Sequence, residues 1–241
     1  MAGHSKWAQI KRKKSANDQK KGQIFSKLAR EISLAVVQGG GVGDPDKNIK
    51  LRMAIEKAKQ NRMPKENIQR AIDKALGRSD SEVSEVFYEG FGPYGVGFII
   101  YSLTDNKNRT INEIRKTLEK YGGKLGVTGS VDYLFAKKSA VFLPKESITE
   151  EDLFKLAEKV KADDIITEDD GYIVVYPLEE MEISLQELSR LGINDCIPEL
   201  FYMPLTTISL TSEQEKTIES LTEELDNLDD VQKVFNNAVS I

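Results

Sequence analysis

The sequence is poor in the residues on which most catalytic and metal sites depend. It contains one cysteine, Cys196, and one histidine, His4, among 241 residues. A single cysteine excludes an internal disulfide and is typical of a reducing compartment, so we expect a cytoplasmic protein. A single histidine excludes metal sites built from several histidines and leaves any Ser-His-Asp type of triad dependent on His4.

Long apolar runs and nucleotide-binding motifs are absent as well. No apolar run approaches the roughly 20 residues that span a bilayer, and no apolar segment of a secretory signal follows the basic N-terminus. The glycine-rich stretch 39–46 follows a predicted helix and lacks a terminal Lys-Ser/Thr pair, which predicts a connector rather than a phosphate loop. We therefore expect no enzyme activity, no cofactor, no metal, no small-molecule substrate and no membrane partner.

Positive charge, by contrast, gathers at one end of the chain. Residues 1–78 hold 19 Lys and Arg against 7 Asp and Glu, a net of +12, whereas residues 79–241 hold 15 against 32, a net of −17. The whole chain has a net charge of −5. So basic a segment in an acidic protein indicates a polyanionic partner, and nucleic acid is the common one. The acidic remainder is left for solvent or for a protein partner.

The candidate contacts for nucleic acid lie mainly in a basic N-terminal arm, residues 1–22. Each cation near a phosphate releases a condensed counterion and so adds salt-sensitive affinity. Trp7 either stacks on an exposed base, which is worth about 1–3 kcal/mol, or anchors the arm on the helices that follow. The candidate cations of the arm and of the first predicted helix are Lys6, Lys11, Arg12, Lys13, Lys14, Lys20, Lys21 and Lys27.

A second, weaker patch lies at 104–110, between a predicted strand and a predicted helix. Caps and turns account for Asn108 and Thr110 there. They do not account for Lys107 or Arg109, which we expect to contact phosphate together with the helix N-terminus.

Apolar periodicity predicts a three-helix bundle over residues 23–79. The first helix begins at Gln23, the second covers about 47–61, and the third begins at Pro64 and ends at Gly77. A linker rich in Ser, Asp and Glu follows, and beyond it the pattern is typical of strands.

The remainder predicts two ferredoxin-like α+β units. Residues 139–203 have the order β-α-β-β-α-β, with an Asp-Gly hairpin at Asp170-Gly171. Around them lie predicted strands at 83–90, 96–103, 130–137, 205–210 and 231–235, a helix opened by a Thr110–Glu113 capping box, and a helix that ends at Asn227. We predict an α+β multidomain fold in which 138–204 is inserted into a discontinuous domain, 80–137 plus 205–241. A sequential order of domains is the alternative.

Several long motifs carry a family resemblance. They are MAGHSKW at the start, GGGVGDPDKNIKLRMAIEKAKQNRMPKENIQRAI, YEGFGPYGVG, DNKNRT, GGKLGVTGSVDYLF and DDGYIVVY. Through them the sequence resembles the YebC/PmpR family, which also contains the mitochondrial translational activator of cytochrome oxidase subunit one. The resemblance covers nearly the whole chain and begins at residue 2. It therefore favours a mature bacterial-type protein over the mitochondrial transit peptide that the acid-poor arm would otherwise suggest.

The resemblance also implies a function. It implies a three-domain, cytoplasmic regulator of gene expression, and it makes Gly3–Trp7, hence His4, Ser5, Lys6 and Trp7, part of the nucleic-acid contact. Members of the family are described as DNA-binding transcriptional regulators, which is the function we expect. They are also described as ribosome-associated factors that relieve stalling at proline-rich stretches, so ribosomal RNA is the alternative partner. No base-reading helix or zipper in the sequence favours DNA over RNA.

Overall fold

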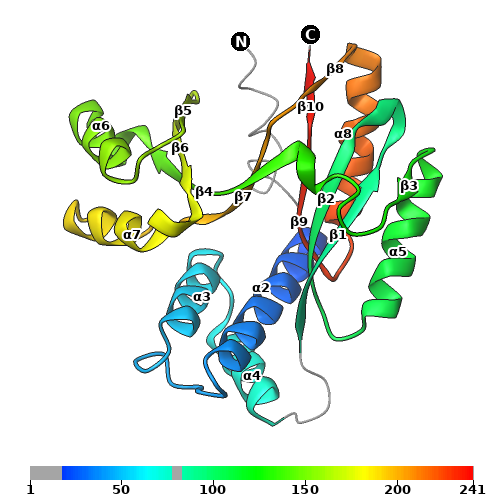
Figure 1. The fold of residues 1–241 in the computed structure, drawn as a ribbon. Coiled ribbons are helices and arrows are strands. Elements are labelled where there is room, and N and C mark those ends of the chain that lie inside the picture. Colours follow the sequence, from blue (N-terminus) through cyan, green and yellow to red (C-terminus); the bar gives the residue numbers. More distant parts are fainter. Residues whose placement is uncertain (1–17, 78–82, 241) are drawn as a thin grey trace.

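The N-terminal part of the described chain is helical (Figure 1). The computed structural model describes residues 18–77 and 83–240, with side chains for 22–77 and 83–239. Helix α2 contacts the two helices that follow it, and the three share an apolar core that includes Ile32, Leu51 and Ile72. The helices are α2 (Asp18–Gln38), α3 (Ile49–Gln60) and α4 (Lys65–Leu76).

Helix α2 already includes Asp18, the first described residue, and so extends beyond the predicted start at Gln23. The apolar stripe fails before Gln23, and Gly22 is a poor helix former, so periodicity alone missed the helical residues 18–22. Lys and Gln are good helix formers, however, and they carry the helix through this polar stretch. The other boundaries agree closely with the prediction, with Pro64 as the N-cap of α4 and Gly77 as its C-cap.

Sheet A has four strands in the order β3-β1-β2-β9, and every neighbouring pair is antiparallel. Helices α5 (Lys107–Lys120) and α8 (Ser212–Asp226) cover one face of it through a core that includes Phe98, Ile114 and Leu221. The strands are β1 (Ser84–Phe91), β2 (Gly97–Thr104), β3 (Lys124–Leu125) and β9 (Val231–Asn236).

Sheet B also has four antiparallel strands, in the order β5-β6-β4-β7. This is the order expected for a split β-α-β-β-α-β unit. As predicted, Thr149 caps the first helix and an Asp-Gly turn joins the middle hairpin. The elements are β4 (Phe135–Pro144), α6 (Glu150–Lys159), β5 (Asp164–Thr167), β6 (Gly171–Pro177), α7 (Met181–Arg190) and β7 (Glu199–Pro204).

Two predicted strands differ from the observed ones in their bounds and in their pairing. The strand predicted at 130–137 begins only at Phe135, as the first part of the long strand β4 of sheet B. Within the strand predicted at 205–210, β8 (Ile208–Leu210) pairs in parallel with β10 (Ala238–Ser240), outside both four-stranded sheets. In sheet A, β1 lies beside β2, and all eight residues of β1 pair with it.

In the chain, the strands of sheet B lie between β3 and β9, so residues on both sides of them build sheet A. The domain boundaries given above stay a prediction.

An aromatic cluster joins the two sheets on the faces that their helices leave bare. The Tyr202 ring of sheet B lies 5.2 Å from the Phe235 ring and 5.9 Å from the Phe87 ring of sheet A, measured between ring centroids. Phe201 meets Phe235 edge to face at 6.2 Å. Figure 1 shows α6 and α7 at one end of the molecule and α5 at the other.

Candidate nucleic-acid interface

The described chain starts beside the loop between α8 and β9, residues 227–230. There the Gln23 amide donates to the carbonyl of Asn227 at 3.3 Å. Lys20 and Lys21 lie in α2, and only their backbone is described. The other arm candidates lie outside the described residues: His4, Ser5, Lys6, Trp7, Lys11, Arg12, Lys13 and Lys14.

Lys27 points into the protein. Its ammonium lies 3.1 Å from the Asp226 carboxylate, and its side chain is only 9% exposed. The same ammonium donates to the Asp226 carbonyl in the last turn of α8, where the helix dipole favours a cation. Because its charge is already paired inside the protein, we leave Lys27 out of the surface proposed below.

The buried carboxylate of Asp230 gathers four groups from three segments. Its Oδ2 accepts hydrogen bonds from Thr104 at 3.0 Å, Thr110 at 2.7 Å and Arg109 at 2.6 Å. Its Oδ1 forms an ion pair with the Arg30 guanidinium of α2 at 2.9 Å. Burial raises the pKa of Asp230, but the bonds from Thr110 and Arg109 and the charge of Arg30 outweigh burial, so the pKa is lowered.

This cluster explains most of the 104–110 patch without a ligand. Asn106 is the N-cap of α5 and accepts from the Arg109 amide at 3.1 Å. The predicted Thr110–Glu113 capping box is therefore wrong, because the helix starts earlier and Thr110 turns inward to Asp230. Arg109 also pairs with Asp105 at 3.0 Å, yet 43% of its side chain stays exposed. Lys107 is exposed beside it.

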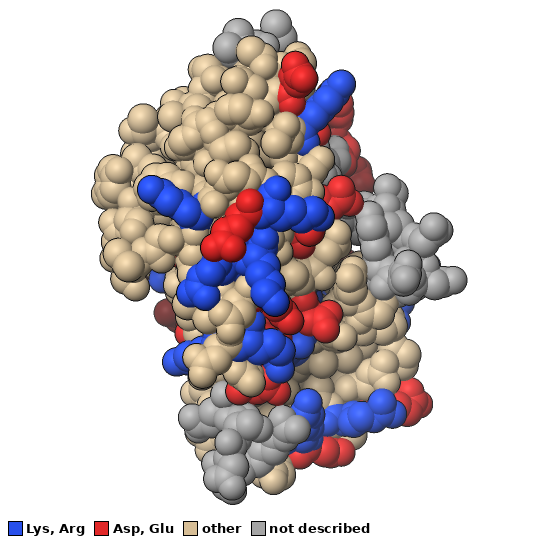
Figure 2. Space-filling model, turned by 90° about the vertical axis from the view of Figure 1, so that its right-hand side faces the viewer, with Lys and Arg blue, Asp and Glu red and all other residues tan. Residues whose placement is uncertain are grey.

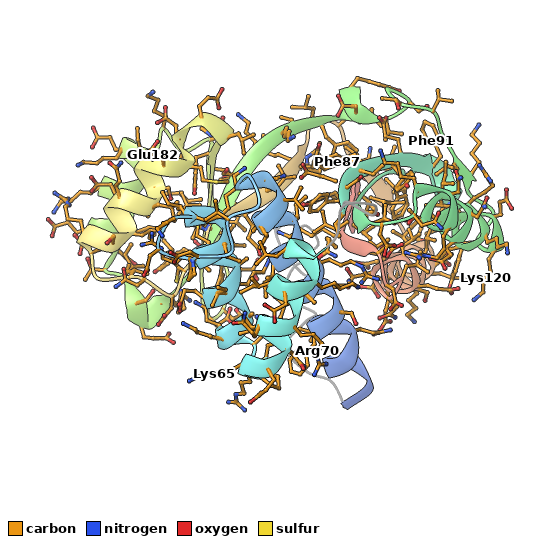
Figure 3. All side chains as sticks on the ribbon, turned by 90° about the horizontal axis from the view of Figure 1, so that it is seen from below. Lys65, Arg70, Phe87, Phe91, Lys120 and Glu182 are labelled. Atoms are coloured by element: carbon orange, nitrogen blue, oxygen red, sulfur yellow. The ribbon has the colours of Figure 1, made fainter. Side chains whose placement is uncertain are left out.

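Two surfaces that carry exposed cations bear on the predicted contacts, one around α5 and one around α4. Figure 2 shows Lys and Arg interleaved with Asp and Glu on the face that includes α5, where Lys120 pairs with Glu224 at 2.7 Å. Helix α4 and the loop before it carry four exposed cations, which no ion pair engages within the described residues, together with the exposed acids Glu66 and Asp73. Figure 3 shows two of the cations, Lys65 and Arg70, on the outer side of α4. We call these four cations the α4 surface: Arg62, Lys65, Arg70 and Lys74.

Family models cover both halves of the chain. The model described as "TACO1/YebC protein N-terminal domain" matches residues 5–78, and the model described as "TACO1/YebC second and third domain" matches residues 83–238. The chain belongs to the TACO1/YebC family.

Individual relatives agree with the TACO1/YebC family models. A protein of Persephonella marina named "Probable transcriptional regulatory protein" is 44% identical over 98% of this chain and 95% of its own length. A protein of the same description from Thermoanaerobacter pseudethanolicus is 43% identical over 98% and 96%. The crystal structure of a conserved hypothetical protein from Aquifex aeolicus matches with a TM-score of 0.85 at 38% identity, over 98% of this chain and 97% of that one.

The loop 126–132 lies in the motif GGKLGVTGSVDYLF of this TACO1/YebC protein. Like the 104–110 patch, it is held by a buried acid. Glu89 of β1 accepts hydrogen bonds from the amides of Gly129 and Val131, each at 2.7 Å, and from that of Asp132 at 3.0 Å. An acid inside an apolar strand is a signal that sequence reasoning can use, because a buried carboxylate needs partners. Asp230, in an acidic stretch typical of a solvated loop, gives no such signal.

Catalytic and metal chemistry finds little support in the described part of this TACO1/YebC chain. No group of three His, Cys, Asp or Glu side chains there is placed to hold a metal ion. Cys196 is half-buried in the loop before β7, and burial raises the pKa of its thiol. No described helix is long and apolar enough to cross a membrane.

Proposed function

We propose that this chain is a non-catalytic, cytoplasmic regulator of gene expression that binds DNA through its basic arm and the helices α2–α4. The name "Probable transcriptional regulatory protein", carried by relatives that match along the full chain, supports the regulatory role. The arm residues His4, Ser5, Lys6 and Trp7 and the cations Lys11, Arg12, Lys13, Lys14, Lys20 and Lys21 make the main contact.

The observation that carries the proposal is the separation of charge along the chain. The net charge of +12 on residues 1–78 attracts a polyanion, and the net charge of −17 on residues 79–241 repels it. Nucleic acid is therefore oriented toward the N-terminal part before any specific contact forms. The affinity of such a contact comes largely from counterion release.

The α4 surface extends this contact beyond the arm. Its four cations are exposed on one helix and the loop before it, so all of them are accessible to phosphate groups. Lys107 and Arg109 contribute at most a minor contact with phosphate, since Arg109 already pairs with Asp105 and Asp230.

Neutralising Lys11, Arg12, Lys13 and Lys14 to alanine tests the proposal. Because the variant has four fewer cations beside phosphate groups, the slope of log affinity against log salt should become shallower by about 3.6 for duplex DNA, at about 0.9 per neutralised phosphate. The affinity for a mixed-sequence duplex oligonucleotide near physiological salt should fall by at least tenfold, measured by fluorescence anisotropy.

A matched control replaces four exposed lysines of the acidic part, residues 79–241, with alanine: Lys145, Lys155, Lys159 and Lys161. This variant should keep the salt slope of the wild type. Equal falls in affinity in the two variants would contradict a contact through the arm. Tighter binding of single-stranded RNA of the same sequence than of the duplex would contradict DNA as the target.

A further inference from the structure

Strand β5 is the outermost strand of sheet B and pairs on one side only. Within the described residues its partner is β6, whereas the opposite edge of the sheet, β7, lies against sheet A, where Glu199 pairs with Lys233. The hairpin of β5 and β6 carries the motif DDGYIVVY, which the proposed DNA contact does not use. Because an open strand edge presents unpaired N–H and C=O groups, it is able to pair with a strand of another chain.

The hydrogen bonds of the hairpin determine which peptide groups of β5 point outward. The amide of Glu168 donates to the carbonyl of Gly171 at 2.8 Å, so these two residues form a hydrogen-bonded pair across the turn. Hydrogen-bonded and non-hydrogen-bonded pairs alternate along an antiparallel ladder, which places Ile165 and Thr167 at non-hydrogen-bonded positions. Their N–H and C=O groups therefore point away from β6, toward the side of β5 that has no neighbouring strand.

The side chains of β5 hold this edge in place. Ile165 packs against the core beneath α6 and α7, whereas Ile166 packs on the opposite face, against the aromatic cluster between the sheets. Asp164 and Thr167, at the two ends of the strand, are exposed. A strand anchored on both faces keeps its register, so the outward peptide groups are positioned before a partner arrives and binding costs less ordering entropy.

Acidic side chains surround the edge. Residues 163–170 include five Asp and Glu and no Lys or Arg. Asp163 pairs with a lysine of β4, but no ion pair within the described residues engages the exposed carboxylates of Asp164 and Asp169. Glu168 is 9% exposed, and its Oε1 has no hydrogen-bond partner in the described part of the chain. This negative potential attracts a basic partner and repels nucleic acid.

An exposed aromatic side chain lies on the helix next to the edge. Phe154 of α6 is 64% exposed. Lys159 of the same helix pairs with Glu187 of α7 at 2.7 Å, so the flank of α6 that carries Lys159 faces α7. Phe154 lies five residues earlier, which is about 140° around an α-helix. Since Figure 1 shows α6 beside β5 and α7 nearer β4, Phe154 lies on the flank of α6 toward the open edge.

We propose that the open edge of β5 binds an extended, Lys- and Arg-rich segment of a partner protein, which adds to sheet B as a further strand. Main-chain hydrogen bonds to Ile165 and Thr167 supply the affinity, as in other complexes formed by strand addition. The side chains of the added strand alternate between its two faces, so an apolar one contacts Phe154 while basic ones lie near Asp164 and Asp169. This surface belongs to the acidic part of the chain and does not depend on the DNA contact proposed above.

The Thr167→Pro variant tests the main-chain contact. It removes one outward N–H and keeps the hydrogen bonds between β5 and β6, since proline is tolerated in an edge strand where the amide faces solvent. The probe is a fluorescein-labelled peptide of about nine residues in which Lys and Val alternate. Its affinity for Thr167→Pro should be about tenfold lower than for the wild type, measured by fluorescence anisotropy. The matched control Thr167→Val keeps both the amide and the net charge, so it should bind the peptide as the wild type does.

Amide hydrogen exchange in the wild-type protein locates the bound peptide. The amides of Ile165 and Thr167 should exchange about tenfold more slowly with the peptide than without it. The amide of Ile166 faces β6 and is the internal control, because it should exchange slowly in both cases. A peptide with Glu in place of every Lys should neither bind nor protect these amides.

The alternatives give different results. Equal affinities of Thr167→Pro and Thr167→Val would show that charge alone holds the peptide, and would overturn strand addition. If Thr167→Pro fails to fold by circular dichroism, exchange decides, and unchanged rates at Ile165 and Thr167 with bound peptide would overturn the proposal. A wild-type dimer that Thr167→Pro abolishes in analytical ultracentrifugation would assign the edge to a second copy instead of a basic partner. Duplex binding by Thr167→Pro should equal that of the wild type, and a failure of every variant to bind duplex would count against the proposed function alone.

Discussion

The free energy of unfolding of the Asp230→Ala variant should be about 3 kcal/mol lower than that of the wild type, because removing one partner of a buried ion pair costs about 3–5 kcal/mol. The Asp230 side chain is 0% exposed and accepts from Thr104, Thr110 and Arg109 while it pairs with Arg30. Its removal leaves two buried hydroxyls and two guanidiniums without their common acceptor. The lower end of the range applies because the Arg109 guanidinium stays accessible to solvent.

Chemical denaturation followed by circular dichroism measures this change in stability. Asp229→Ala is the matched control, because its side chain is exposed one residue away and its carbonyl, which accepts from Arg30, is kept. That variant should stay within about 0.5 kcal/mol of the wild type, as surface substitutions usually do. A destabilisation as large in Asp229→Ala as in Asp230→Ala would show that the loop, rather than the carboxylate, is the sensitive element.

The destabilisation should also depend on pH with a defined sign. The pKa of Asp230 is lowered in the folded protein, and the unfolded value is about 3.9. The stabilisation is therefore fully present well above that value and is lost as the pH falls through the folded-state pKa. The difference between the wild type and Asp230→Asn should shrink between pH 6 and pH 3, whereas a growing difference would contradict the assignment.

Local patterns predicted the elements of sheet B because each signal there is complete within a few residues. Thr149 caps α6, and Asp170-Gly171 supports the turn between β5 and β6, as the sequence indicates. The order β-α-β-β-α-β then leaves few ways to form one sheet. The same reasoning places helices α3 and α4 within a residue or two of their observed ends.

Long-range partners were beyond the reach of such patterns. The position of β1 in sheet A depends on which strand pairs with the free edge of β2. The sequence of a single segment does not reveal the outcome of that competition. In the same way, Lys27 resembles a solvated cation of a basic region, yet its partner Asp226 lies 199 residues away. Of the candidate interface, sequence reasoning could find the concentration of positive charge but not which cations the fold has already paired.

The Phe235→Ala variant should lose about 4 kcal/mol of unfolding free energy, the middle of the range for truncating a buried aromatic side chain. Phe235 is 4% exposed, and its ring contacts those of Phe201 and Tyr202 across the junction of the two sheets. Residues near the cavity would come from both sheets, so neither sheet alone can close it.

Phe154→Ala removes the same atoms from a side chain that is 64% exposed on α6, and it should cost less than about 1 kcal/mol. Urea denaturation gives both values and the slope m. An unchanged m with a lower midpoint in Phe235→Ala indicates that sheets A and B unfold together. A lower m, or a second transition, would mean instead that the aromatic junction couples two units that fold separately.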